Sequence, residues 1–226
     1  MGELFASYDI IGAFLMTIRL TVFSAIGALL IGTFVAVLRL SPVPLLQWIG
    51  AAYVNVVRNT PLTLICVATM LVLKSNLGIA IADPKSPTSI VDTAFRWGVI
   101  ALSVYHAAFV CEALRSGVNT VPVGQAEAAR SVGLTFGQNL RYVILPQAFR
   151  GAITPLGNVL IALTKNTTVV AVIGVAEIAY LMATMIENSP DLIFAIFLTV
   201  ALGFVILTLP LGLLTTWLGQ RLVVRR

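Results

Sequence analysis

A few basic and amide side chains lie inside otherwise apolar stretches, and these residues are the ones best placed to do chemistry. Arg19 lies within the first apolar run, and Lys165 and Asn166 lie between two later runs. A cation surrounded by apolar sequence is costly unless an opposite charge meets it, and the carboxylate of a small ligand is a natural partner. The pattern favours non-covalent recognition of an anion, and no catalytic residue is assigned.

Two interruptions of the apolar runs indicate where a passage could lie. One is Asn59-Thr60-Pro61, and the other is Thr164–Thr168. Broken helices within a membrane usually line a cavity, because their freed backbone groups need partners. Asn158 precedes Thr164 by nearly two helical turns, so the two side chains face similar directions. The candidate residues of the pathway are Arg19, Asn59, Thr60, Asn158, Thr164, Lys165, Asn166 and Thr167.

The two cations also have structural interpretations. Lys165 is equally compatible with pairing to Glu177 or to backbone carbonyls. Arg19 is compatible with snorkelling to the membrane surface or with pairing to Asp9. The sequence leaves these alternatives open.

The other polar residues of the apolar runs carry weaker signals. His106 is the single histidine and is expected to be a packed core residue rather than a proton relay. Glu112 and Arg115 are expected to form a gate or a helix-cap pair. Cys66 and Cys111 are expected to be buried free thiols. No cluster has the spacing of a metal site, so no metal ligand is assigned.

The composition is that of an integral membrane protein of the all-α class. Hydrophobic residues make up 59% of the chain and charged residues 10%, whereas soluble domains carry about 25% charged residues. The net charge of +5 comes from basic residues scattered singly among apolar runs, which excludes a nucleic-acid surface. The lipid bilayer is therefore the surrounding medium, and residues 1–226 are predicted to form a single membrane domain.

Five apolar segments are predicted to cross the membrane as a helical bundle. The second and fourth include the interruptions described above, and Pro210 predicts a kink in the fifth. The segments are Ile10–Leu38, the run Leu62–Leu73 with its preceding turns, Trp97–Leu114, the pair Gly151–Leu163 and Val169–Ile186, and Leu192–Leu218.

Orientation follows from the basic residues, which are enriched in cytoplasmic loops. We predict a multi-pass protein of the plasma membrane with its N-terminus outside and its C-terminus in the cytoplasm. This places 9 of the 14 basic residues on the cytoplasmic side, namely Arg39, Arg58, Arg115, Arg130, Arg141, Arg150, Arg221, Arg225 and Arg226.

The longest polar region, about residues 118–147, is predicted to form a compact cytoplasmic knob. Gln125–Val132 favours a short helix, and Gly133 is suited to end it in the left-handed conformation. A second short helix is expected at about Thr135–Tyr142. Small residues at the sharp turn allow a partner to approach closely, and the charges of Glu127 and Arg130 lie at its rim.

This region resembles the EAA loop of the membrane subunits of ATP-binding-cassette importers. That pattern is EAA, three residues, Gly, nine residues and then Ile-x-Leu-Pro. Every spacing matches, and Val143 replaces the isoleucine. The resemblance implies that the knob couples to an ATPase subunit through Gly124, Glu127, Ala128, Ala129, Arg130, Gly133, Leu145 and Pro146.

The resemblance extends over nearly the whole chain. The stretches RNTPL (58–62), EALRSGVNTVPVGQAEAARSVGL (112–134), ILPQAFR (144–150) and NVLIALTKNTTVVAVIGVAE (158–177) are similar to permeases for polar amino acids, most of all to actinobacterial glutamate permeases. Membership would imply the type I importer (MetI-like) fold. It would also imply two permease chains, either a sister pair or two copies, with two ATPase subunits and an extracellular substrate-binding protein.

The expected function is the permease step of ATP-driven amino acid import by alternating access, with glutamate as the expected substrate. Aspartate, glutamine or a basic amino acid remain alternatives. The chain has no GxxxxGK[ST] phosphate-binding loop, so it is expected to hold no cofactor, and ATP and Mg would be bound by the partner ATPase. An ion-driven secondary transporter is less favoured because inverted repeats and intramembrane acids are missing from the sequence. A membrane-embedded enzyme lacks converging catalytic groups.

Overall fold

The computed structural model describes residues 7–79, 81–83 and 85–222, and within these residues the chain is helical with no strand. The α-helices are α2 (Ile10–Leu40), α3 (Pro44–Arg58), α4 (Leu62–Ala68), α5 (Ser89–Val118), α6 (Val123–Ser131), α7 (Phe136–Asn139), α8 (Leu145–Asn166), α9 (Ile178–Asn188) and α10 (Ile193–Leu222). Irregular helical turns are the π-helices η1 (Thr69–Asn76) and η2 (Leu140–Ile144) and the 3₁₀-helices η3 (Thr167–Ile173) and η4 (Pro190–Leu192).

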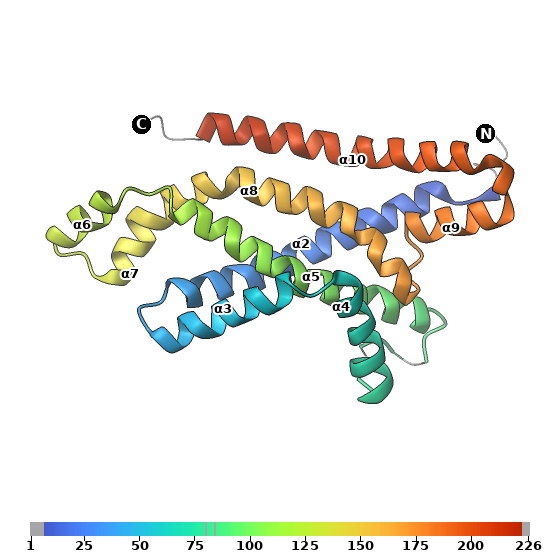
Figure 1. Cartoon of the computed structure of the whole chain (residues 1–226), viewed down its shortest axis with the longest axis horizontal. Coiled ribbons are helices and arrows are strands. Elements are labelled where there is room, and N and C mark those ends of the chain that lie inside the picture. The colour runs from blue at the N-terminus through green and yellow to red at the C-terminus, as the bar shows by residue number, and fades with distance from the viewer. Residues whose placement is uncertain (1–6, 80, 84, 223–226) are drawn as a thin grey trace.

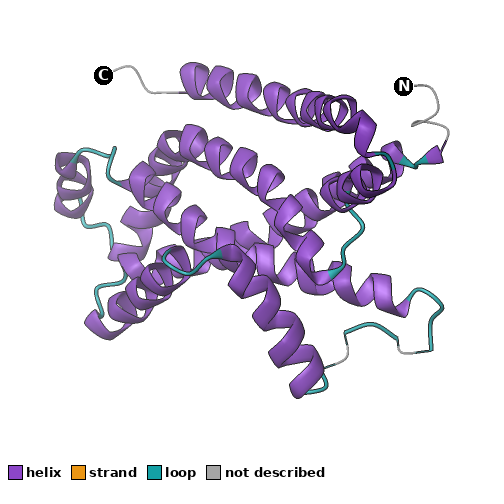
Figure 2. Ribbon diagram, turned by 45° about the vertical axis from the view of Figure 1, so that its right-hand side comes forward, coloured by secondary structure: helices purple, strands orange, loops and turns teal. Residues whose placement is uncertain are grey.

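Four long helices lie side by side in the order α2, α5, α8 and α10 (Figures 1 and 2). The start of α2 and the short helix α9 lie at one end of this bundle. Helices α6 and α7 and the last turn of α10 lie at the other end. The two ends are therefore chemically different, and the polar knob occupies only one of them.

Four of the five predicted crossings are confirmed as long apolar helices, and the remaining one is a bent pair of helices. The four are Ile10–Leu40, Ser89–Val118, Phe136–Ile173 and Pro190–Leu222. The bent pair joins α3 to α4 and η1 through an angle of 101° at Asn59-Thr60-Pro61. Pro61 is the N-cap of α4, where a missing N–H costs nothing, so the second predicted crossing breaks where proline requires it.

The predicted break at Thr164–Thr168 is present only as a change of helix type, from α to 3₁₀ between Asn166 and Thr167. Helix α8 continues through Lys165 to Asn166, and the chain then tightens into η3. The hydroxyls of Thr164 and Thr168 donate to the carbonyls of Leu160 and Lys165, so these polar side chains are satisfied without leaving the helix.

The fourth crossing also ends earlier than predicted. The chain turns at Gly174, whose φ is +81°, and α9 is a separate helix rather than the second half of this crossing. Glu187 lies in the last turn of α9 and is exposed. At Pro210 the helical conformation of α10 is continuous.

Small residues let the long helices approach closely, as is usual in membrane bundles. A Cβ atom added to Gly32 of α2 would lie 2.7 Å from the carbonyl oxygen of Ala107 on α5. One added to Gly117 of α5 would lie 2.2 Å from the carbonyl oxygen of Ala148 on α8. These contacts fix α5 between α2 and α8, whereas α10 presents almost its whole apolar surface outward.

Candidate functional site

Helix α6 carries most of the residues predicted to couple to an ATPase. Its coupling residues Gly124, Glu127, Ala128 and Arg130 are exposed, and Ala129 is buried on the opposite face. Neither Glu127 nor Arg130 is in an ion pair within the described part of the chain. The exposed face of the helix therefore carries small residues and two charges that are in no ion pair with the described residues.

The turn after α6 is held by a Schellman motif. The amide of Gly133 donates to the carbonyl of Arg130 at 2.9 Å, and the amide of Leu134 donates to the carbonyl of Ala129 at 3.2 Å. Gly133 has a φ of +87° and is exposed. This confirms the predicted left-handed cap, which only a residue without a Cβ atom adopts at no cost.

The second helix of the knob is shorter than predicted and is continuous with the following crossing. Helix α7 begins with a capping box between Thr135 and Gln138. The helical conformation then runs through η2 into α8, so Leu145 and Pro146 form the first turn of α8. Movement of the knob would therefore pass directly into α8.

Two side-chain contacts tie α6 to this continuous helix. Asn139 of α7 is buried, and its amide donates to the carbonyl of Ala126 at 3.0 Å. The amide of Gln147 on α8 donates to the side chain of Gln125 and also to the carbonyl of Val143. The knob is thus braced as one unit at the end of the bundle (Figure 1).

A cavity of about 360 Å³ lies between α5 and α8. Its volume falls within the range of small-molecule sites. Apolar and aromatic side chains form most of its wall, with a histidine and two amides among them. The lining residues are Tyr105, His106, Phe109, Asn158, Val159, Ala162 and Asn166.

The polar groups of this cavity are held in fixed orientations. His106 is buried, and its Nδ1 lies 3.0 Å from the carbonyl oxygen of Leu102. Because a carbonyl only accepts, Nδ1 carries the proton and Nε2 accepts from the amide of Asn166 at 3.2 Å. The prediction of a packed histidine is confirmed, but the residue also lines the cavity. The sequence gave no sign of its pairing with Asn166.

The structure brings together only some of the predicted pathway residues. Asn158 and Asn166 line the cavity. Thr164 and Thr167 are buried and donate to backbone carbonyls within their own segment. Lys165 is exposed and lies outside the lining of the cavity, and no pairing with Glu177 forms. Glu177 instead caps α9 by accepting from the amides of Ala179 and Tyr180.

Arg19 lies apart from the cavity on an exposed face of α2. Asp9 does not pair with it, because the Asp9 carboxylate caps α2 by accepting from the amide of Gly12. Among the described residues Arg19 is in no ion pair. These contacts leave snorkelling as the remaining structural interpretation of this side chain.

The bend between α3 and α4 lies near the middle of the bundle (Figure 1). Asn59 and Thr60 cap the end of α3 by donating to the carbonyls of Asn55 and Val56. The guanidinium carbon of Arg58 lies 5.5 Å from the ring centroid of Phe109, which lines the cavity. Arg58 was predicted on the cytoplasmic side with eight other basic residues, whereas α3 carries its side chain to Phe109 within the bundle.

A cluster of charges joins α2 to α5 nearer the knob. The carboxylate of Glu112 accepts from Arg39 of α2 and lies 3.4 Å from Arg115 on its own helix. Pairing of Glu112 with Arg115 was predicted, but the cross-helix partner Arg39 was not. The cluster begins one helical turn beyond Phe109 along α5, at the end of the cavity that faces the knob.

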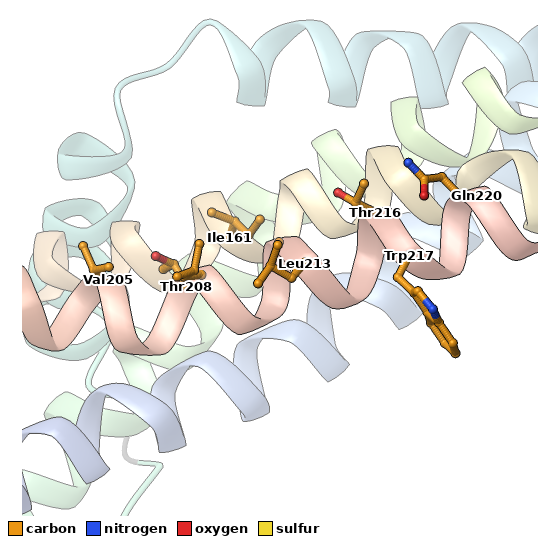
Figure 3. Close-up of a pocket in the computed structure, with 9 residues that line it drawn as sticks. Ile161, Val205, Thr208, Leu213, Thr216, Trp217 and Gln220 are labelled. Atoms are coloured by element: carbon orange, nitrogen blue, oxygen red, sulfur yellow. The ribbon is translucent and has the colours of Figure 1, made fainter.

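A second, larger hollow of about 600 Å³ runs along α10 (Figure 3). Ile161 of α8 contributes to it, together with side chains of α10 such as Thr208, Leu213 and Thr216. It is an open groove on the outward surface and contains none of the predicted pathway residues. The smaller cavity contains the predicted pathway residues Asn158 and Asn166 and lies between two helices of the bundle, and we therefore regard it as the candidate site.

Comparison with known families gives a match over residues 28–224 to the binding-protein-dependent transport system inner membrane component. This chain belongs to that family. Its members are permease subunits of ATP-binding-cassette importers, which work with a separate ATPase and a substrate-binding protein. The family member described here is accordingly a multi-pass protein of the cell membrane.

Individual relatives cover the permease almost completely. It is 51% identical over 218 residues to the glutamate transport system permease protein GluC of Corynebacterium glutamicum, with 96% of each chain covered. It is 36% identical to a probable glutamine permease of Bacillus subtilis, with 92% of this chain and 91% of the relative covered.

Solved structures show the same fold. A chain of an amino acid ABC transporter crystallised with histidines is 30% identical to this permease, with a TM-score of 0.78 and coverage of 94% and 93%. The methionine transporter MetNI gives a TM-score of 0.75 at 20% identity, with 95% and 96% covered. The expected type I importer (MetI-like) fold is therefore confirmed.

Proposed function

We propose that this permease imports glutamate by alternating access, driven by ATP hydrolysis in its partner subunits. The single observation that supports glutamate most strongly is the 51% identity, over nearly the full length, to a glutamate permease. The glutamine permease of Bacillus subtilis is more distant at 36% identity. Aspartate fits the same chemistry, because its side chain carries the same carboxylate.

Coupling is assigned to the knob of α6 and α7. Closure of the ATPase pair would push on the exposed small residues and charges of α6. The Schellman turn at Gly133 and the bracing contact between Asn139 and Ala126 keep α6 from moving alone. Because α7 is continuous with α8, the push would tilt α8 and so change the cavity between α8 and α5.

The pathway is assigned to that cavity, with Asn158 and Asn166 as polar contacts and His106 fixing the position of Asn166. The Glu112 cluster would close the passage toward the knob, because it joins α2 to α5 immediately beyond Phe109. Lys165 and Arg19 are not assigned as contacts of the solute, because both are exposed and neither lines the cavity.

The end of the bundle with the knob is assigned to the cytoplasm, together with the last turn of α10, and the start of α2 to the outside. The enrichment of basic residues supports this orientation. A second permease chain, either a sister or another copy, would complete the pore. ATP and Mg would be held by the two ATPase subunits.

A competition assay tests the substrate. The complete complex is reconstituted in liposomes with its binding protein, and uptake of labelled L-glutamate is measured against unlabelled glutamate, aspartate, glutamine and arginine. Glutamate should compete at the lowest concentration, and the same amino acid should give the greatest stimulation of ATP hydrolysis. Competition by glutamine or arginine at lower concentrations than glutamate would reject the assignment.

A further inference from the structure

Arg58 is a cation whose side chain is exposed on the surface of this chain, although α3 carries it toward the middle of the bundle. Helix α3 begins at Pro44, next to the end of α2, and Arg58 is its last residue. A helix rises about 1.5 Å per residue, so Arg58 lies about 21 Å from Pro44 along α3. The apolar core of a membrane is about 30 Å thick, and this side chain is therefore at membrane depth.

The surface around Arg58 is not one that lipid covers. Asn55 lies one helical turn before Arg58 and the C-cap residue Asn59, and all three are exposed on the same side at the end of α3. A charged side chain at this depth faces a water-filled passage or another protein chain, because contact with lipid tails is too costly. The face of α3 that carries these residues therefore borders the solute path or the second permease chain.

No described residue neutralises the charge of Arg58. Within the described residues no carboxylate is in an ion pair with it, whereas Arg39 and Arg115 share Glu112. Arg58 makes a cation–π contact with Phe109, in which the guanidinium carbon lies 5.5 Å from the ring centroid. A cation beside an aromatic face is attracted by the ring and not by a hydrogen-bond acceptor, so this contact holds the group without using its N–H donors.

The ring that orients Arg58 is also a wall of the cavity. Phe109 lines the cavity with Asn158 and Asn166, which have no charge of their own. Arg58 is not itself one of the lining residues, but it contacts Phe109 in the wall and is in no ion pair with a described residue, so its charge is available to an anionic solute at this wall. The planar fork of arginine matches a carboxylate through two parallel hydrogen bonds.

We propose that Arg58 is a substrate-binding residue, which holds a carboxylate of the amino acid at the bend between α3 and α4 while the solute occupies the cavity. This proposal rests on the proposed import function. It assigns to Arg58 the role that the sequence suggested for Lys165. Since the 101° bend directly follows Arg58, any change of that bend during transport would move the guanidinium toward or away from the cavity.

The test uses the complete complex in liposomes, with uptake of labelled L-glutamate and ATP hydrolysis measured in the same vesicles. Arg58→Gln removes the charge and keeps much of the length of the side chain. The glutamate imported per ATP hydrolysed should fall about tenfold or more, as for loss of one charge-assisted hydrogen bond. Stimulation of ATP hydrolysis by the loaded binding protein should persist. Arg58→Lys keeps the positive charge but lacks the planar guanidinium. Its ratio of glutamate imported to ATP hydrolysed should lie between those of the wild type and Arg58→Gln.

Arg221→Gln is the matched control. The guanidinium carbon of Arg221 lies 4.4 Å from the ring centroid of Trp217, so this variant removes an equivalent stacked cation far from the cavity. Its import per ATP should equal that of the wild type. Equal ratios for Arg58→Gln and wild type would overturn the proposal, and so would a parallel loss of uptake and stimulated hydrolysis, which indicates a structural role.

Two further outcomes are decisive. If Arg58→Gln fails to assemble, Arg58→Lys carries the test, and a wild-type ratio in that variant overturns the bidentate contact. If wild-type vesicles take up another amino acid and no glutamate, the proposed substrate fails. The Arg58 comparison then proceeds with that amino acid, because every amino acid presents a carboxylate.

Discussion

Replacing Gly133 by valine should loosen the coupling knob and reduce transport without introducing a clash. Gly133 has a φ of +87°, and a Cβ atom added there would meet no other atom within 4 Å. The penalty is therefore one of backbone conformation, about 1–2 kcal/mol for an L-residue in the left-handed region, with a β-branched residue at the upper end. One to two kcal/mol raises the equilibrium constant for opening of the turn by about 5- to 30-fold.

Hydrogen exchange measures that opening directly. The amides of Gly133 and Leu134 make the two bonds of the Schellman motif, so exchange at Leu134 should accelerate by the same factor in Gly133→Val. Uptake by the reconstituted complex should fall, while ATP hydrolysis should fall less, because the push of the ATPase reaches α8 less efficiently. Asparagine is similar in size to valine but tolerates a positive φ. Exchange and uptake should therefore change less in Gly133→Asn than in Gly133→Val.

Gly137→Ala is the control within the same knob. Gly137 is in α7, and an added Cβ atom there also meets nothing within 4 Å, so alanine should be neutral or slightly stabilising. If exchange at Leu134 is unchanged in Gly133→Val, the strain reasoning is refuted. If exchange accelerates while coupled uptake stays at the level of Gly137→Ala, the turn does not transmit the push.

Two further predictions concern the stability of the bundle, measured by thermal unfolding of the purified protein in detergent. Glu112→Gln should destabilise by about 1–2 kcal/mol, because Arg39 and Arg115 lose their shared carboxylate in a partly exposed site, whereas fully buried pairs cost about 3–5 kcal/mol to break. The double variant Arg39→Met with Glu112→Leu should recover part of this loss of stability. A double variant less stable than Glu112→Gln would contradict this explanation. Gly117→Val should cost about 1–3 kcal/mol or more, because its Cβ would lie 2.2 Å from the carbonyl oxygen of Ala148. In the control Gly212→Ala the nearest atom, Ile161 Cδ1, is 3.5 Å away, so equal melting of the two variants would show that α5 and α8 do not approach as described.

Local signals in the sequence were sufficient for the crossings and for the end of α6. An apolar run long enough to cross a membrane is a property of composition, and a glycine that ends a helix acts through its own φ. Both were therefore predictable, as was the family, whose characteristic spacings lie within one continuous stretch around Glu127–Gly133.

Polarity alone did not show how the chain continues after the interruption in the fourth crossing. The α-helix ends at Asn166, as Thr164, Lys165 and Asn166 suggested, but threonine hydroxyls bond to carbonyls of the preceding turn and the chain continues as a 3₁₀-helix. The chain turns only at Gly174, where a positive φ is required. Local polarity also suggested Lys165 as the cation that meets a carboxylate of the solute, whereas the position of Arg58 in the structure leads us to propose Arg58 for that role.

The sequence by itself determined that this chain is a bundle of membrane-crossing helices with an exposed coupling knob, because apolar length, proline, glycine and motif spacing act over a few neighbouring residues. Only the tertiary structure decided which polar groups meet. His106 and Asn166 are separated by 60 positions, and Arg58 reaches Phe109 because α3 enters the bundle and stops halfway. Such meetings depend on how whole helices pack, and no local pattern contains that information.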